Sequence, residues 1–224
     1  MKVNVIFLDY HRHDFTARVK DRNFNNAGYP FDHVVIDMKG VSAALNAGIR
    51  QSLHYDAVVT MANDILMPDG WLSAMVQAAE AIPNTGMAGV HTVEAFPPSE
   101  IINGVRVHPN YTAFGNVLIP ISAIRKVGFF NLDFDPYSMN DADYALRLNE
   151  TGHINYYVND LHADHIGADT GTGSEYRKMK DEGLSTGLQK FNFWADYYRK
   201  NNNYCLDFDQ DFIINQTEWP SIST

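Results

Sequence analysis

A carboxylate follows a short apolar run that has the character of a buried strand. The run "VVTM" at residues 58–61 leads into Asn63 and Asp64, and a turn at residues 68–70 precedes an apolar-periodic segment. This order predicts a strand, a turn and a helix. Ligands of open α/β sheets bind beyond the carboxyl ends of the strands, where one Asp can hold a divalent cation that bridges nucleotide phosphates. The alternative is that Asp64 stabilises only the turn, because Asn and Asp favour turns in any protein.

Further acidic and histidine side chains recur where strands are predicted to end and in the loops between elements. They are Asp37, Asp141 with Asp143, and His162 with His165. Each of them alone has a structural explanation, since an Asp at a helix start caps the helix and a loop His is commonly just solvated. Strand ends along one edge of an α/β sheet converge in space. The order of these groups therefore predicts that they surround one cleft.

The composition narrows the classes of function. The 224 residues carry 17 basic and 27 acidic side chains, a net charge of −10, which argues against an extended nucleic-acid surface but leaves a local patch open. Cys205 is the only cysteine, so an internal disulfide framework is excluded and a reducing compartment is compatible. The motif G-x-x-x-x-G-K-[ST] and a strand-linked G-x-G-x-x-G are both missing, which excludes the common P-loop and dinucleotide fingerprints.

The start of the chain, "MKVNVIFLDY", lacks the pattern of a signal peptide. Apolar runs in the sequence are all too short to span a membrane. We therefore expect a soluble, cytoplasmic protein, and the length suits one large domain.

Apolar periodicity predicts alternating strands and helices. Strands are expected at residues 3–8, 33–37, 56–61, 86–91, 114–120 and 154–160, and helices within 11–28, 39–53, 70–82, 121–128, 139–152 and 184–200. Such alternation over roughly the first ninety residues is typical of an α/β fold with a mostly parallel, doubly wound sheet.

Residues 92–113 interrupt the alternation with three prolines and little periodicity, which predicts a loop-rich insertion with a short hairpin. We expect one domain over residues 1–200. Its nucleotide-binding half covers 1–91, and its acceptor and catalytic half covers 92–200 and includes a small antiparallel portion. Residues 201–224 form a polar tail with scattered aromatic side chains.

Two sequence blocks carry a resemblance to a known family. The first runs from "VVID" through "KGVSAALNAGI" to "NDILMPDGWL", and the second is "GNVLIPISAIRKVGFFNLDFDPYSMNDADYALRLNETGHINYYV". Over residues 3–167, and more loosely to 204, their order resembles the large inverting family of GT-A glycosyltransferases that contains many bacterial rhamnosyltransferases. The resemblance implies a GT-A, Rossmann-like sheet flanked by helices.

The resemblance also implies donor-binding roles in the first half of the chain. Tyr10 stands where the family lines the pocket for the base. Asp37 matches an acid that contacts the nucleobase of uridine-type donors. Asn46 matches the Asn of an A-x-N-x-G helix that lies near the nucleotide.

The family's D-x-D motif falls on Ala62, Asn63 and Asp64. Asp64 takes the position of the metal ligand and Asn63 that of a donor contact, whereas Ala62 replaces the first acid. His165 matches a His that completes the metal site, and His162 is the alternative or a supporting residue. The resemblance implies Mn²⁺ or Mg²⁺, and an imidazole ligand favours Mn²⁺.

Asp141 matches the second residue of the family's E-D pair, which implies that it is the catalytic base, and Asn140 stands where Glu is usual. Asp143 lies two residues further along the predicted helix and points about 200° away, so we expect it to support the site without touching the substrate. The aromatic segment 134–137 is expected to form part of the acceptor wall.

The predicted activity is the metal-dependent, inverting transfer of a sugar from a UDP- or dTDP-type nucleotide-sugar donor to a hydroxyl acceptor. The acceptor class stays open among glycan, lipid-linked saccharide, protein and modified nucleic acid. Two alternatives share the nucleotide-binding half: a nucleotidyltransferase, and a catalytically degenerate module of the same fold that binds nucleotide sugars or glycans.

Overall fold

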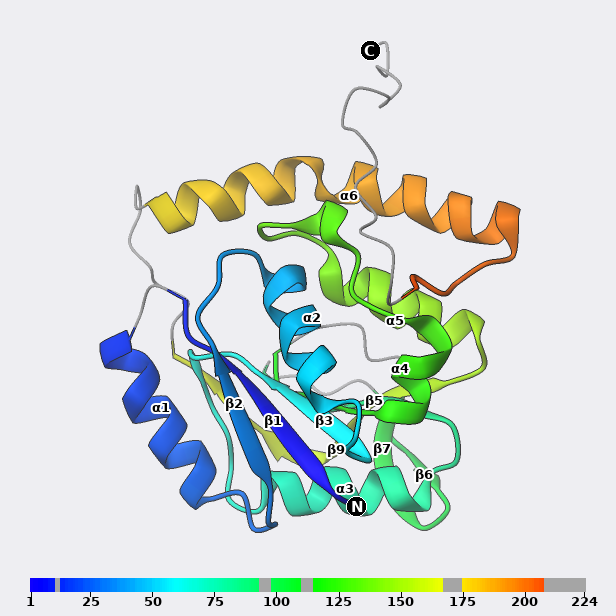
Figure 1. Ribbon diagram of the computed structural model, residues 1–224. Helices are drawn as coiled ribbons and strands as arrows, with labels where there is room; N and C mark the ends of the chain where they lie inside the picture. Colours follow the sequence, from blue (N-terminus) through cyan, green and yellow to red (C-terminus); the bar gives the residue numbers. More distant parts are fainter. Residues whose placement is uncertain (11–12, 93–97, 110–114, 167–174, 208–224) are drawn as a thin grey trace.

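The computed structural model describes residues 1–10, 13–92, 98–109, 115–166 and 175–207 (Figure 1). The strands are β1 (Val3–Leu8), β2 (Asp32–Ile36), β3 (Ala57–Met61), β4 (Ile65–Leu66), β5 (Thr85–His91), β6 (Glu100–Ile102), β7 (Val105–Pro109), β8 (Val117–Pro120), β9 (Ile154–His162) and β10 (Asp164–His165). The helices are α1 (His13–Asn25), α2 (Val41–Ser52), α3 (Trp71–Ala81), α4 (Ile121–Val127), the 3₁₀ helix η1 (Leu132–Phe134), α5 (Asn140–Glu150) and α6 (Glu175–Asn201).

An eight-stranded sheet forms the centre of the molecule, in the order β2-β1-β3-β8-β5-β9-β7-β6. β1 pairs in parallel with β2 and β3, and β5 pairs in parallel with β9. β8 lies antiparallel between β3 and β5, so these two strands point the same way. The strands β2, β1, β3, β5 and β9 therefore share one direction, although β8 runs the opposite way between β3 and β5, and their carboxyl ends meet at one edge.

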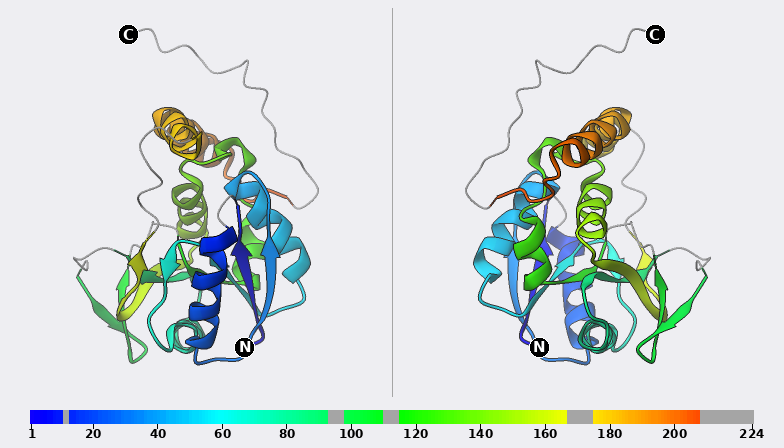
Figure 2. Two further views of the ribbon diagram at one scale, coloured as in Figure 1. Left: turned by 90° about the vertical axis from the view of Figure 1, so that its left-hand side faces the viewer. Right: turned by 90° about the vertical axis from the view of Figure 1, so that its right-hand side faces the viewer.

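Alternate side chains of the central strands enter two separate cores. In β1, Val3, Val5 and Phe7 join one cluster and Ile6 joins the other. α1 and α3 cover the first face of the sheet, whereas α2, α4 and α5 cover the second (Figure 2). This period of two along β1 is the reason that a short strand can anchor helices on both faces.

α6 crosses above the carboxyl ends of the central strands (Figure 1). Trp194 and Tyr198 of this helix are fully buried, and both belong to a third cluster with Phe134 of η1. The indole Nε1 of Trp194 also donates to Oδ2 of Asp133 at 2.8 Å. The C-terminal half of α6 is thereby fixed to the loop that precedes α5.

Two features go beyond the predicted elements. β4 and β10 form a second, two-stranded antiparallel sheet, and strands of two residues are too short to produce a periodic signal. α6 begins at Glu175, earlier than the predicted start at residue 184. The polar stretch before Gly183 carries no apolar period that would predict a helix. The hairpin predicted within residues 92–113 is formed by β6 and β7.

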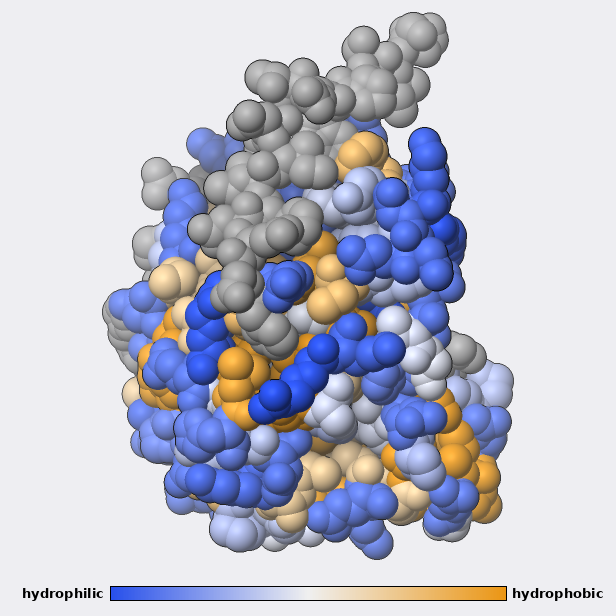
Figure 3. Space-filling model, turned by 45° about the vertical axis from the view of Figure 1, so that its right-hand side comes forward, coloured by the Kyte–Doolittle hydropathy of each residue, from blue (hydrophilic) through white to orange (hydrophobic). Residues whose placement is uncertain are grey.

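The surface carries mainly hydrophilic residues on the face shown in Figure 3, with apolar residues in smaller areas between them. Within the described part of the chain, every helix is too short or too polar to cross a membrane.

Candidate active site

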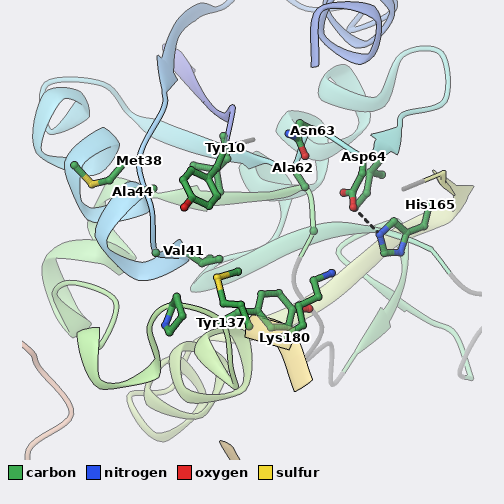
Figure 4. Close-up of a pocket in the computed structure, with 16 residues that line it drawn as sticks. Tyr10, Met38, Val41, Ala44, Ala62, Asn63, Asp64, Tyr137, His165 and Lys180 are labelled. Carbon is green, nitrogen blue, oxygen red and sulfur yellow. Dashed lines mark hydrogen bonds and ion pairs between the residues drawn. The ribbon is translucent and has the colours of Figure 1, made fainter. Parts of the chain in front are cut away.

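A cavity of about 150 Å³ opens at the carboxyl edge of the sheet. Its walls come from the ends of β1 and β3, the start of α2, the loop before α5, β10 and α6 (Figure 4). Of the residues predicted for the site, Tyr10, Asn63, Asp64 and His165 line this cavity. Tyr10 and Met38 lie toward one end of it, and Asp64 and His165 lie at the other.

Asp64 and His165 are brought together by the small sheet that the sequence does not predict. β10 pairs antiparallel with β4, which places His165 opposite Ile65. The backbone N–H of Ile166 donates to the carbonyl oxygen of Asp64 at 2.9 Å. Nδ2 of the buried Asn23 donates to the carbonyl oxygen of Ile65 at 2.9 Å, so α1 holds β4 in place.

The side chains of this pair touch each other and reach the cavity. Nε2 of His165 lies 3.2 Å from Oδ2 of Asp64, and the side chains are 41% and 19% exposed. The hydrogen bond with Asp64 raises the pKa of the His165 imidazole. His162 instead ends β9, with its Nε2 3.9 Å from Oδ1 of Asp164, and is not among the residues that line the cavity. The structure therefore places His165, and not His162, against Asp64.

The Asp64–His165 pair fits two adjacent positions around a divalent cation. Ligands about 2.2 Å from a cation and at right angles lie about 3.1 Å apart, and the observed separation is 3.2 Å. Within the described residues, no cluster of three or more His, Cys, Asp or Glu side chains is arranged to hold a metal. A cation at this pair would take its remaining ligands from a bound donor and from water, in keeping with Ala62 at the first position of the motif.

The predicted donor contacts follow the ends of three neighbouring strands. Tyr10 follows β1 and lines the cavity, and Asp37 directly follows β2, where it is exposed and adjacent to the lining residue Met38. Asn63 lines the cavity after β3, and its Nδ2 donates to Oγ1 of Thr16 at 3.1 Å. Tyr10 and Asn63 thus face the cavity, and Asp37 lies at its margin.

Asn46 lies outside the cavity, in the interior of the protein. It is 8% exposed, its Nδ2 donates to the carbonyl oxygen of Phe130 at 2.9 Å, and its Oδ1 accepts from the N–H of Phe130 at 2.8 Å. This two-point contact joins α2 to the segment after α4. An effect of Asn46 on donor binding would therefore act through the position of α2.

The start of α2 forms one wall of the cavity and is capped by a distant carboxylate. Asp135 accepts hydrogen bonds from the backbone N–H groups of Ser42 and Ala43 at 2.7 and 3.0 Å. Gly40 precedes the helix with a φ of 93°, and a Cβ there would lie 2.7 Å from the Asp135 carboxylate. Because Asp135 satisfies these N–H groups, the helix start does not serve as an anion site of the usual kind.

Asn140 has a structural role at the position where the family usually has Glu. It is 4% exposed, its Nδ2 donates to Oγ of Ser42 at 2.6 Å, and its Oδ1 accepts from the N–H of Ser138 at 3.1 Å. A carboxylate lacks the donating amide that the contact with Ser42 uses here. Asn140 therefore ties α5 to α2, and Asp141 is the acid that this motif retains.

Asp141 and Asp143 both belong to the first turns of α5 but have different surroundings. Asp143 is 1% exposed, its Oδ2 lies 2.9 Å from Nη2 of Arg147, and its Oδ1 accepts from the hydroxyl of Tyr198 at 2.9 Å. Asp141 is partly exposed, and its Oδ1 accepts from the N–H of Ala142 at 2.8 Å. Asp143 is thus a buried anchor, whereas Asp141 is partly exposed and is not among the residues that line the cavity.

Tyr137 lies in the wall of the cavity, in the loop that precedes α5. Burial raises the pKa of its phenol, and the charges of Asp141 and Asp64 raise it further. Tyr137 and Pro136 line the cavity, whereas Phe134 is fully buried against α6, and the role of this segment as an acceptor wall stays a prediction. The cavity wall thus connects the Asp64 end of the site to the start of α5.

Lys180 is a cavity residue that sequence reasoning does not identify. Its Nζ lies 4.7 Å from the centre of the Tyr137 ring. Burial lowers the pKa of its ammonium group, and the charge of Asp64 opposes this change. Lys180 precedes the predicted start of the last helix, so no motif or periodicity marks it, and only the tertiary position of α6 reveals it.

No protein family profile matches the chain, and no curated protein matches it in sequence. Solved structures do match it. The structure of GalNAc-T7 with UDP, GalNAc and Mn²⁺ matches with a TM-score of 0.61 and 8% identity, over 94% of this chain and 52% of that one. A Drosophila β-1,4-galactosyltransferase 7 variant with manganese, UDP-Gal and xylobiose gives 0.53 and 12%, over 80% and 79%. The mannosyltransferase PcManGT from Pyrobaculum calidifontis with GDP-Man and Mn²⁺ gives 0.57 and 15%, over 76% and 58%.

These similarities establish the fold. The chain has the α/β fold of the GT-A glycosyltransferases, with a central sheet flanked by helices, as the sequence predicts. It spans 52% of the GalNAc-T7 chain and 58% of the mannosyltransferase chain. Because the matched enzymes act with different sugars at low identity, the rhamnosyltransferase-like subtype stays a prediction.

Proposed function

We propose that this protein is a metal-dependent, inverting glycosyltransferase that transfers a sugar from a nucleotide-sugar donor to a hydroxyl acceptor. The observation that carries the proposal is the Asp64–His165 pair, which lies in the cavity at the carboxyl edge of a GT-A sheet. The matched structures hold UDP, UDP-Gal or GDP-Man together with manganese. That correspondence supports a nucleotide diphosphate as the ligand of this cavity.

The donor would lie along the cavity, with its base near Tyr10 and Met38 and its diphosphate near Asp64 (Figure 4). An aromatic and a thioether side chain provide apolar contacts for a flat base. Asp37 at the margin is suited to accept a hydrogen bond from the ring N–H of uracil or thymine. These contacts favour a UDP- or dTDP-type donor.

Asp64 and His165 would hold Mn²⁺ or Mg²⁺, since one carboxylate oxygen and one imidazole nitrogen are adjacent. The cation would stabilise the negative charge that develops on the leaving diphosphate. The imidazole favours Mn²⁺ over Mg²⁺, because imidazole is a better ligand for transition metals than for Mg²⁺.

Asp141 is the proposed catalytic base. Its carboxylate takes the proton of the acceptor hydroxyl as the hydroxyl oxygen forms a bond to the anomeric carbon. The bond from that carbon to the diphosphate breaks, and its electron pair leaves with the nucleoside diphosphate. Attack on the face opposite the leaving group inverts the anomeric configuration. Asp141 lies in the first turn of α5, four residues after the cavity-lining Tyr137, which supports a position close to the donor site.

A binding module of the same fold is the second candidate, and one observation favours it. Ala62 and Asn140 replace two acids of the family pattern, and Asn140 is committed to Ser42 and Ser138. Incubation with UDP- and dTDP-sugars separates the candidates: a transferase passes the sugar to water or to an added hydroxyl acceptor and releases nucleoside diphosphate, and a binding module releases none. A nucleotidyltransferase, given nucleoside triphosphate and sugar phosphate, would release pyrophosphate.

The nucleotide and metal site itself is tested by a thermal-shift screen of nucleoside diphosphates with and without Mn²⁺. A ligand at 100 times its Kd stabilises the folded protein by about 2.7 kcal/mol. We expect UDP or dTDP to produce such a shift with Mn²⁺, and we expect Asp64→Ala to remove the Mn²⁺-dependent part while the protein stays folded. Asp69→Ala, at an exposed position outside the cavity, is the matched control. A full Mn²⁺-dependent shift in Asp64→Ala would refute the metal assignment.

A further inference from the structure

The N-terminal half of α6 approaches the loop before α5 more closely than side chains would allow. Gly183 faces Tyr137, and a methyl group on Gly183 would overlap the carbonyl oxygen of Tyr137. Gly187, one turn later, faces Ser138, and a methyl group there would overlap its Oγ. The hydroxyl of Ser138 also donates to the carbonyl oxygen of Gly183 at 3.2 Å. The two glycines therefore let this part of α6 contact the loop through backbone.

This close contact determines which side chains of α6 reach the cavity. One turn before Gly183 and two turns before Gly187, Met179 and Lys180 form part of the cavity wall. The ammonium group of Lys180 lies over the ring of Tyr137, 4.7 Å from its centre. In Figure 4 its amino end points toward the Asp64–His165 side of the cavity.

The charges around the cavity match a diphosphate. Asp64 and Lys180 are the acidic and the basic side chain of the described cavity wall, with His165 beside them. Their charges cancel, so a divalent cation at Asp64 and His165 would give this end of the cavity a charge of about +2. A nucleoside diphosphate leaves with two to three negative charges. Without Lys180, the negative charge of Asp64 would reduce the charge at this end of the cavity to about +1. The positive charge of Lys180 compensates for Asp64.

We propose that Lys180 binds the diphosphate of the donor, and that Gly183 and Gly187 hold it there by seating α6 against Tyr137 and Ser138. The proposal rests on the proposed function, since it assigns a second charge contact within the same donor site. Lys180 stabilises the leaving group by a charge-assisted hydrogen bond to a phosphate oxygen. Lys180 is therefore a substrate-binding residue, and the two glycines are positioning residues.

The test measures the affinity for UDP and dTDP in the presence of Mn²⁺ by titration calorimetry. We expect Lys180→Met to weaken the better of the two by at least about 10-fold, the range of a hydrogen bond to a charged group. Lys180→Arg should recover most of the loss. Lys178→Met removes the same charge from an exposed position two residues earlier and should leave the affinity unchanged. The salt dependence of binding should be shallower in Lys180→Met than in Lys178→Met, because one charge contact is lost.

The outcomes separate this inference from the proposed function. If the unmodified protein binds neither diphosphate with Mn²⁺, the proposed function fails, and the inference falls with it. If the unmodified protein binds and Lys180→Met binds equally well, with the same salt dependence as Lys178→Met, only the role of Lys180 is refuted.

The positioning role is tested by Gly183→Ala. The added methyl group should move α6 away from Tyr137 and reduce diphosphate affinity about as much as Lys180→Met does. Leu184→Ala changes the adjacent, half-exposed position and should have no effect. Circular dichroism checks that the Gly183→Ala helix content is unchanged, and the double variant Gly183→Ala, Lys180→Met should bind no more weakly than either single variant. Additive losses in the double variant would overturn the positioning role.

Discussion

Two acid–base pairs in this molecule are similar in chemistry and opposite in surroundings. Asp143 and Arg147 lie 2.9 Å apart on α5, with side chains 1% and 0% exposed. Asp64 and His165 lie 3.2 Å apart at the edge of the cavity, with side chains 19% and 41% exposed. The first pair is enclosed by protein, and the second faces a space large enough for part of a ligand.

The surroundings explain the difference in role. The guanidinium of Arg147 also donates to the carbonyl oxygens of Val127 and Phe129 at 2.7 and 3.0 Å. Asp143 accepts a further bond from the hydroxyl of Tyr198. The protein thus uses the polar atoms of this pair to fix α5, α6 and the end of α4 together. At the cavity, the imidazole and carboxylate are partly exposed, which leaves them accessible to the proposed cation. A pair becomes functional where the fold leaves part of its bonding capacity to a ligand.

The comparison is tested most strongly by removing one partner of the buried pair. Asp143→Ala leaves the charge of Arg147 buried without its carboxylate, so we expect the free energy of unfolding to fall by about 3–5 kcal/mol. Urea denaturation measures this loss. Asp64→Ala, as the matched variant of the exposed pair, should change the same quantity by less than about 1 kcal/mol. Equal losses in the two variants would show that the pairs do not differ in role.

The next largest effect concerns the two acids of α5. We expect Asp141→Asn to lower kcat by at least about 100-fold, since a positioned base contributes about 10²–10⁴-fold. The amide keeps the shape of the side chain and its acceptor oxygen for the N–H of Ala142, so donor affinity and melting temperature should stay nearly unchanged. Turnover of a UDP- or dTDP-sugar with an active acceptor measures the effect. Near-normal turnover in Asp141→Asn would show that Asp141 has only a structural role at the start of α5.

A smaller effect is expected at Asn46, which the resemblance assigns to the donor and the structure assigns to the protein interior. Asn46→Ala removes both bonds to the backbone of Phe130, and a buried polar group that loses its partner costs about 1–3 kcal/mol. We expect the stability to fall by this amount while the UDP affinity of the folded protein changes less than twofold. A loss of affinity at unchanged stability would instead favour direct contact with the donor.

The parts of the fold that the sequence predicts are those with a repeating local pattern. The first strand is predicted at residues 3–8 and is observed at Val3–Leu8, because its apolar run is bounded by polar residues. Asp64 is identified for the same reason, as the polar residue that ends such a run. The α/β class follows from this alternation, and the GT-A fold follows from the order of the two motif blocks.

The remaining features depend on contacts between distant segments, which carry no local signal. β4 and β10 have two residues each, yet their pairing is what brings His165 to Asp64. Lys180 lines the cavity, and Gly183 and Gly187 allow its helix to pack closely against the loop before α5. Asn46 is the opposite case. The resemblance places it next to the nucleotide, whereas its side-chain amide is hydrogen-bonded to the backbone N–H and carbonyl oxygen of Phe130. Residue types alone do not reveal which polar atoms form hydrogen bonds within the protein and which face a ligand site.

The smallest effect is expected at Asp37, and it tests whether the margin of the cavity contributes to base recognition. Asp37 is exposed after β2, so its carboxylate remains partly hydrated and its contribution is limited. Replacement by Asn exchanges a charge-assisted hydrogen bond for a neutral one, which is about half as strong. We therefore expect Asp37→Asn to weaken the binding of UDP or dTDP by about 5- to 10-fold, near 1 kcal/mol, with kcat at saturating donor unchanged.

Asp69→Asn is the control for an exposed carboxylate elsewhere, and titration calorimetry measures the affinity of both variants. Because uracil and thymine share the ring N–H, both diphosphates should weaken together. An equal affinity in Asp37→Asn and the unmodified protein would confine base recognition to Tyr10 and Met38 inside the cavity.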